Sequence, residues 1–230
     1  MRELSLRPRG DLLKVLAVGA HSDDIEIGCG ATIVQLADQY PAVHVDWVVL
    51  TADGQRRDEA QDAAEALLAG TTSHSIHIEN FRGSYLPAQW AAVKDRFEEF
   101  KPFDPDLVLV HSRRDAHQDH RTVGELAWNT FRDHLVLEYE IPKYDGDLGA
   151  PSLFVPVSEA AMERKIDTLM NVFRSQHSRS WFTADTFASL MRLRGVECNS
   201  PSGYAEAFYV RKLVLGPTLS NLSRNRSDSP

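Results

Sequence analysis

The stretch that decides the fold is KVLAVGAHSDDIEIGCG at residues 14–30. Its first seven residues, 14–20, are a short apolar run with β-branched content, which predicts a buried strand. Residues 27–40 predict a helix that has Ile33 and Leu36 on one face. A buried strand followed directly by a helix indicates the beginning of an alternating α/β fold.

The same alternation continues along the chain. Further strands are predicted at 43–52, 74–79 and 106–111, and further helices at 56–69, 87–100 and 119–133. Strands that alternate with helices form parallel βαβ units, which cover both faces of the sheet. We therefore expect a Rossmann-like, three-layer α/β/α architecture with a mostly parallel sheet.

The pattern changes after residue 135, where we expect a C-terminal α/β extension of the same domain. Strands are predicted at 135–141, 152–158 and 205–215, and helices at 159–173 and 184–194. Residues 1–215 are expected to form a single domain. The remaining polar residues, 216–230, are rich in turn-forming types and predict a flexible tail.

Composition excludes several classes of function. The chain has 230 residues and a formal charge of −8, which argues against a nucleic-acid or anionic-membrane binder, since both need a basic face. Cys29 and Cys198 form no Cys-x-x-Cys pair, so neither a thiolate zinc site nor a disulfide framework is indicated. No apolar run approaches the ~20 residues of a membrane span, and we expect a cytoplasmic protein without membrane insertion. The sequence leaves open whether the protein forms a homo-oligomer.

Histidines and aspartates gather at two predicted strand ends, in residues 20–30 and 111–120. Ligands of open α/β sheets bind outside the carboxyl ends of the strands, so the two segments are expected to meet. Imidazole and carboxylate suit zinc, and a catalytic zinc site needs three protein ligands and one open position. In the adjacent pair Asp23 and Asp24, one carboxylate can bind metal while the other accepts a proton from water.

Four segments resemble the PIG-L/LmbE-like N-acetylglucosaminyl deacetylases. AHSDDIEIGCGAT at 20–32 resembles their Ala-His-Pro-Asp-Asp-Glu signature, and DAHQDHRTVG at 115–124 resembles their His-Pro-Asp-His signature. TADGQRRDEAQDAAEALLAG at 51–70 resembles a Thr-x-Gly followed by Arg-x-x-Glu, and FRSQ at 173–176 resembles a late Ser-Gln motif. The first two are specific as a pair. The resemblance covers most of residues 14–176 in the same order.

The resemblance implies a zinc-dependent hydrolase that removes an N-acetyl group from an amino sugar or a glycoside carrying one. Fe²⁺ or another divalent ion remains an alternative to zinc. The departures from the pattern are Ser22, Ile25 and Gln118, none of which removes an implied ligand or base. The implied metal ligands are His21, Asp24 and His120; Asp23 is the implied general base, His117 stabilises the tetrahedral intermediate with Asp119 as its partner, and Arg56 lies near the substrate.

These residues suggest a mechanism. Zinc lowers the pKa of bound water to about 7, and Asp23 would accept the proton as hydroxide attacks the acetamide carbonyl. His117 would stabilise the oxyanion in its protonated form, with Asp119 raising its pKa. Either Asp23 or His117 would protonate the leaving amine.

Three further residues are candidates for contact with the substrate. Arg113 could frame a polar group, Trp181 could stack on a sugar face, and Tyr204, near Glu206, could line the pocket.

Two other classes of function stay open. Two histidines and one carboxylate also describe the site of non-haem iron oxygenases, although the α/β pattern and the adjacent Asp23 argue against that class. A non-catalytic carbohydrate-binding relative is the other alternative, and the presence of every implied ligand and of the base disfavours it.

Overall fold

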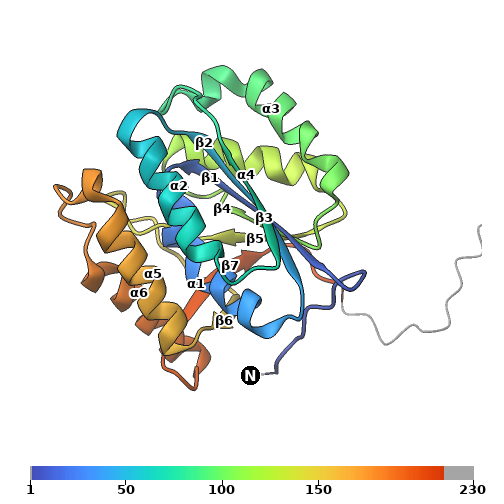
Figure 1. Ribbon diagram of the computed structural model, residues 1–230, viewed down its shortest axis with the longest axis vertical. Helices are drawn as coiled ribbons and strands as arrows, with labels where there is room; N and C mark the ends of the chain where they lie inside the picture. The colour runs from blue at the N-terminus through green and yellow to red at the C-terminus, as the bar shows by residue number, and fades with distance from the viewer. Residues whose placement is uncertain (1, 215–230) are drawn as a thin grey trace, which may run out of the picture.

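A seven-stranded sheet forms the centre of the protein, of which the computed structural model describes residues 2–214 (Figure 1). The strands are β1 (Leu13–His21), β2 (Val43–Thr51), β3 (Ser73–Ile78), β4 (Leu107–His111), β5 (Leu135–Tyr139), β6 (Leu153–Pro156) and β7 (Ala205–Val210). The α-helices are α1 (Asp24–Gln39), α2 (Gly54–Leu68), α3 (Trp90–Glu99), α4 (Gln118–Thr130), α5 (Glu159–Val172) and α6 (Ala184–Cys198). Short 3-10 turns lie at Leu86–Gln89, Lys101–Phe103 and Arg174–Gln176.

The strand order is β3-β2-β1-β4-β5-β7-β6. Every pairing from β3 to β5 is parallel, and β7 runs antiparallel to both β5 and β6. The predicted mostly parallel sheet with a C-terminal extension is therefore confirmed. The extension contributes its last strand, β7, in the opposite direction and places β6 at the edge.

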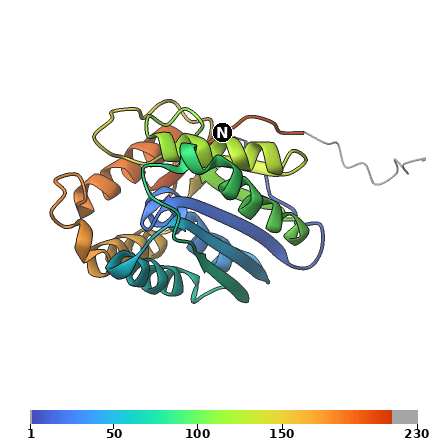
Figure 2. The ribbon, with the colours of Figure 1, turned by 90° about the horizontal axis from the view of Figure 1, so that it is seen from above.

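Helices cover both faces of the sheet and produce the three predicted layers (Figures 1 and 2). One hydrophobic core lies between the sheet and α1, α2, α5 and α6, and a second lies between the sheet and α3 and α4. Alternate residues of β1 face the two cores: Val15 and Ala17 belong to the first, and Leu16 and Val18 to the second. This explains the unbroken apolar run of β1, because a strand buried on both faces needs no polar side.

Several predicted boundaries need correction. The helix predicted from residue 27 begins at Asp24, because the polar turn after β1 passes directly into α1. The late strand predicted over 205–215 ends at Val210. The tail predicted at 216–230 lies outside the described residues. None of the helices within residues 2–214 combines the length and apolar character needed to cross a membrane.

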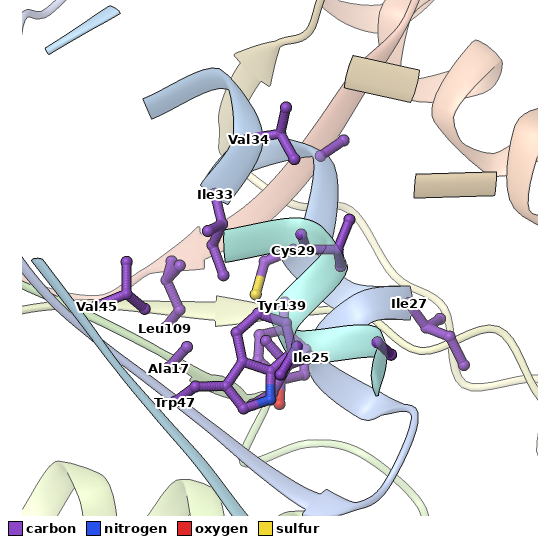
Figure 3. Packing of buried hydrophobic residues seen from close by; sticks show 14 of the residues in the cluster. Ala17, Ile25, Ile27, Cys29, Ile33, Val34, Val45, Trp47, Leu109 and Tyr139 are labelled. Atoms are coloured by element: carbon purple, nitrogen blue, oxygen red, sulfur yellow. The ribbon is translucent and has the colours of Figure 1, made fainter. Parts of the chain in front are cut away.

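α1 consists of two helical parts joined at a bend. Cys29 has φ −151° and ψ 16°, which is not helical backbone. Ile25, Cys29 and Ile33 point toward the sheet and Tyr139 (Figure 3). Gly28 lies against the Tyr139 ring, where an added Cβ would overlap the ring carbons. The bend thus brings the backbone of α1 close to the end of β5.

Candidate metal centre

The candidate site lies at the carboxyl ends of β1 and β4. These two strands are neighbours, and the chain continues from β1 toward β2 on one side and from β4 toward β5 on the other. Such a change of direction is the position at which open α/β sheets bind ligands. The two polar segments selected from the sequence, which lie about ninety residues apart, meet there as expected.

Three donor groups converge at this point. His21 Nδ1 lies 3.1 Å from His120 Nε2 and 3.3 Å from an oxygen of Asp24, and His120 Nε2 lies 3.5 Å from the other oxygen. A tetrahedral zinc ion with bonds of about 2.1 Å separates its ligand atoms by about 3.4 Å. The predicted ligands therefore have the spacing of one face of a metal-centred tetrahedron. The His21 side chain is 18% exposed, which leaves an approach to this face.

A carboxylate fixes the tautomer of each of these histidines. His120 Nδ1 lies 2.9 Å from Asp115, and His21 Nε2 lies 3.1 Å from Asp119. Because a carboxylate accepts the ring N–H, the other nitrogen of each ring presents its lone pair. Two imidazole lone pairs 3.1 Å apart repel each other unless a cation lies beside both. The donor set therefore fits a divalent metal ion.

His111, which was not predicted from the sequence, also belongs to this cluster. Its Nε2 lies 3.0 Å from Asp24, and its ring stacks on His120 with centroids 3.8 Å apart. Among the described residues, two further combinations of side chains could hold an ion: His111, Asp24 and His120, and His21, His117 and His120. The position of His111 as the last residue of the fourth predicted strand was the available signal. Asp115 was missed as well, because a residue that supports a ligand has no spacing rule of its own.

The expected general base, Asp23, is buried beside Arg56. Arg56 donates to Asp23 Oδ1 at 3.0 Å and to the Ser22 hydroxyl at 2.8 Å. Burial raises the pKa of Asp23, and the Arg56 guanidinium opposes that shift. The serine that replaces the usual proline thus provides a second anchor for the arginine that contacts Asp23.

Asp119 does not support His117 in the expected way. Its carboxylate lies beside His21 and accepts from the backbone N–H groups of Ser84 and Leu86. Its own backbone N–H donates to His117 Nδ1 at 3.2 Å. Burial, followed by the charges of the neighbouring histidines, lowers the pKa of His117 and outweighs Asp119, which raises it as expected. His117 is therefore neutral in this geometry and carries its proton on Nε2.

The pKa values of His21 and Asp24 are shifted in opposite directions. Burial alone would disfavour the His21 imidazolium, but Asp24 and Asp119 raise the pKa of His21 to about 10. Burial likewise opposes ionisation of Asp24, but the nearby imidazoles of His120, His111 and His21 hold its pKa well below the usual range. In the metal-free protein, a proton on His21 occupies the place of the cation.

The three other expected substrate contacts have partners away from the metal-type cluster. Arg113 pairs with Glu138 at 3.1 Å and stacks over Trp128. Tyr204 lies near Arg192 in a shallow groove along α6. Trp181 packs edge-on against the aromatic rings of its own segment and lies 6.5 Å from the ring of Tyr144. The structure brings Arg56 to the cluster and leaves Arg113 and Tyr204 outside it.

The two weaker motifs contact each other. Glu59, from the Arg-x-x-Glu segment on α2, is buried and accepts hydrogen bonds from the backbone and the hydroxyl of Ser175 at 2.9 and 2.5 Å. Ser175 belongs to the late Ser-Gln segment, and Gln176 donates to its hydroxyl. This contact fastens the segment after α5 to the helix that carries Arg56.

Fold and site together define an α/β protein with a His/Asp metal-type site at the point where the strand order reverses. The chain belongs to the PIG-L family, described as GlcNAc-PI de-N-acetylase, whose model matches residues 16–131. The resemblance inferred from the sequence is thereby confirmed, and the chain is a hydrolytic N-deacetylase of this family.

Individual relatives agree with this assignment. The uncharacterized deacetylase YaiS of Escherichia coli is 32% identical over 138 residues, which are 56% of this chain and 74% of YaiS. The N,N'-diacetylchitobiose deacetylase of Pyrococcus horikoshii has a TM-score of 0.66 at 23% identity, covering 86% of this chain and 83% of its own.

One structural neighbour catalyses a different reaction. GalB of Pseudomonas putida, a 4-carboxy-2-hydroxymuconate hydratase, has a TM-score of 0.70 at 20% identity, covering 90% of this chain and 100% of its own. The fold alone therefore does not decide the reaction. The assignment as a deacetylase rests on the family match.

Proposed function

We propose that this chain is a zinc-dependent N-deacetylase that releases acetate from an N-acetylated amino sugar or from a glycoside carrying one. The observation that carries the proposal is the triangle of His21, Asp24 and His120, with a carboxylate behind each histidine and Asp23 beside it. Fe²⁺ or another divalent ion fits the same donors. A cytoplasmic location belongs to the same proposal.

The residues around the triangle supply the acid-base chemistry. A bound divalent ion would polarise the acetamide carbonyl and acidify a water molecule. Asp23 would hold the proton taken from that water, and Arg56 helps to keep its carboxylate ionised between turnovers. His117, neutral and protonated on Nε2, would donate a hydrogen bond to the developing oxyanion. Asp23, which would carry the proton taken from water, would then donate it to the leaving amine.

Substrate recognition is a separate part of the proposal. Arg56 lies at the site with its side chain partly exposed, and it is the arginine that we propose to contact the substrate. Trp181 remains a proposed stacking surface for a sugar, since it lies at the edge of the core beside the exposed Tyr144. Arg113 and Tyr204 have no such position, and we do not include them.

The test is a screen of the zinc-loaded protein against N-acetylated amino sugars, nucleotide sugars and glycosides. Mass spectrometry is expected to show loss of an acetyl group from at least one class, with one acetate released per amine, under air and without oxygen alike. His120→Ala serves as the control. An absolute requirement for oxygen would favour the oxygenase alternative. No turnover of any member with zinc fully bound would favour a non-catalytic carbohydrate-binding protein.

A further inference from the structure

The bend in α1 frees backbone groups that a straight helix would pair internally. In a continuous helix, the N–H groups of Ala31 and Thr32 would donate to the carbonyls four residues earlier. Here they donate to the two carboxylate oxygens of Glu206, at 3.1 and 2.6 Å. The Ile27 carbonyl, on the other side of Cys29, accepts from Lys165 Nζ at 2.6 Å. Two side chains therefore satisfy both sides of the bend.

These two side chains also form a buried ion pair. Lys165 Nζ lies 2.6 Å from Glu206 Oε1, and the two side chains are each only 3% exposed. Lys165 comes from α5 and Glu206 from β7, which are both parts of the C-terminal extension. Burying two charges is costly, and the cost is offset only where further hydrogen bonds complete the geometry. The bend in α1 supplies those hydrogen bonds.

The bend connects this ion pair to the metal triangle. The Ile27 N–H donates to the Asp23 carbonyl at 3.1 Å. Ile27, whose carbonyl accepts from Lys165, is therefore also hydrogen-bonded to Asp23. One residue further, Gly28 lies directly against the Tyr139 ring, and the Tyr139 hydroxyl donates to the Val18 carbonyl of β1 at 2.7 Å. A change in the angle of the bend would therefore move Asp23 and Asp24 relative to β1.

We propose that Lys165 and Glu206 are positioning residues that set the angle between the two parts of α1, and so hold Asp23 and Asp24 at the metal site. The inference rests on the proposed function, because the site that it concerns is the His21–Asp24–His120 triangle. The hydrogen bonds of the pair go to the backbone of α1 and to each other, and none goes to the side chains of the three ligands in the described residues. Its effect passes through the backbone of α1.

The experiment separates positioning from stability by replacing both charges with apolar side chains. Lys165→Met alone leaves Glu206 buried without its cation and is expected to destabilise the protein strongly. In the double variant Lys165→Met/Glu206→Leu the unpaired charge is gone, so Tm is expected to rise above that of Lys165→Met, but to stay below that of the parent because the N–H groups of Ala31 and Thr32 and the Ile27 carbonyl lose their partners. The zinc affinity of the double variant is expected to stay lower by about tenfold or more, as for other supports of metal ligands.

The measurements are the zinc dissociation constant from competition with a chelator, and Tm of the metal-free protein. The matched control is the double variant Arg194→Met/Glu140→Leu, which removes another buried ion pair, 2.8 Å apart, that does not contact α1. It is expected to change Tm while zinc affinity stays within about twofold of the parent. Equal losses of zinc affinity in both double variants would overturn the inference.

A second variant keeps the test decisive if the double variant fails to fold. Glu206→Gln retains the shape of the side chain and one carbonyl acceptor, so that one of the two N–H groups in the bend loses its partner. Lys165 also loses its anion, so Tm of the metal-free protein is expected to fall as well, and zinc affinity is measured well below that temperature. Zinc affinity is expected to fall several-fold with the fold intact; an affinity equal to that of the parent would overturn the inference. The proposed function fails separately, if the parent and His120→Ala bind zinc equally well.

Discussion

The N-terminal half of the sheet and the C-terminal extension contribute to the site in different ways. β1, β4 and the segments that follow them supply every metal-type donor, together with Asp23 and His117. The extension supplies supports: Lys165 and Glu206 bind the bend of α1, and Ser175 binds Glu59 on α2. Reactive groups are close together in sequence on two strand ends, whereas the groups that hold them come from distant elements. The following predictions test this division.

Removing a donor from the N-terminal half is expected to have the largest effect. His120→Ala deletes one vertex of the triangle and leaves Asp115 without its imidazole partner. Zinc affinity should fall by more than the roughly 10- to 100-fold typical of losing a supporting residue. Metal analysis of the purified variant measures this, with His134→Ala, a histidine paired with Asp104 away from the site, as the control. Full zinc occupancy in His120→Ala would remove this residue from the ligand set.

The next largest effect concerns the base. Asp23→Asn keeps the shape of the side chain and the contact with Arg56 but cannot accept a proton. Turnover is expected to fall by about 100- to 10,000-fold, the usual contribution of general acid-base catalysis, while zinc occupancy is unchanged. Acetate release and metal content are measured on the same sample. Turnover at the rate of the parent would contradict the role of Asp23.

Metal binding should also depend on pH through His21. Its pKa in the metal-free protein is raised to about 10, so a proton must leave before this ring can bind zinc. Affinity should therefore increase with pH, by up to about tenfold per unit between pH 6.5 and 9. Conversely, the raised pKa contributes stability to the metal-free protein below about pH 6.5, which is lost as pH approaches 10.

Calorimetry in buffers of different ionisation enthalpy counts the protons released when zinc binds. About one proton is expected from His21 at pH 7.5, in addition to any from the metal-bound water. His21→Ala should abolish this proton and most of the binding. A zinc affinity that is independent of pH would show that His21 is neutral in the metal-free protein.

Arg56 should affect the pH profile more than the maximal rate. Burial raises the pKa of Asp23 and Arg56 opposes that shift, so Arg56→Met is expected to raise the pKa further. The base is active when deprotonated, and the acid limb of the kcat profile should therefore move to higher pH. Arg113→Met, which loses the contact with Trp128 and a partner that Glu138 shares with Arg211, is the control and should leave the limb in place. An acid limb at the same pH in both variants would contradict the effect of Arg56 on the pKa of Asp23.

The sequence alone predicted that the polar segments after β1 and β4 meet at one edge of the sheet. It did not predict the residues that hold the side chains of this site in place. The meeting of the two segments was predicted because parallel strands end at one edge, a rule that needs no distances, and the choice of His21, Asp24 and His120 as ligands came from the family resemblance. His111 was missed although it ends the fourth predicted strand, and Asp115 was missed because it acts only through His120. Glu206 was considered only as a neighbour of Tyr204 in the pocket, and Lys165 not at all, since a bend at Cys29 that frees backbone groups becomes visible only in three dimensions. Asp119 was correctly placed at the site, yet it contacts His21 rather than His117.

The smallest effect on zinc affinity and activity is expected for Tyr204 in the C-terminal extension. Its substitution should behave differently from that of Glu206, two residues further along the chain. Tyr204 lies in the groove along α6 near Arg192, so Tyr204→Phe should change the free energy of unfolding by no more than about 0.5 kcal/mol. Its kcat/KM and zinc affinity should equal those of the parent. Glu206→Gln, two residues further along the chain, should weaken zinc binding. A loss of kcat/KM in Tyr204→Phe would instead extend the substrate site to α6 and would give the extension a direct role in recognition.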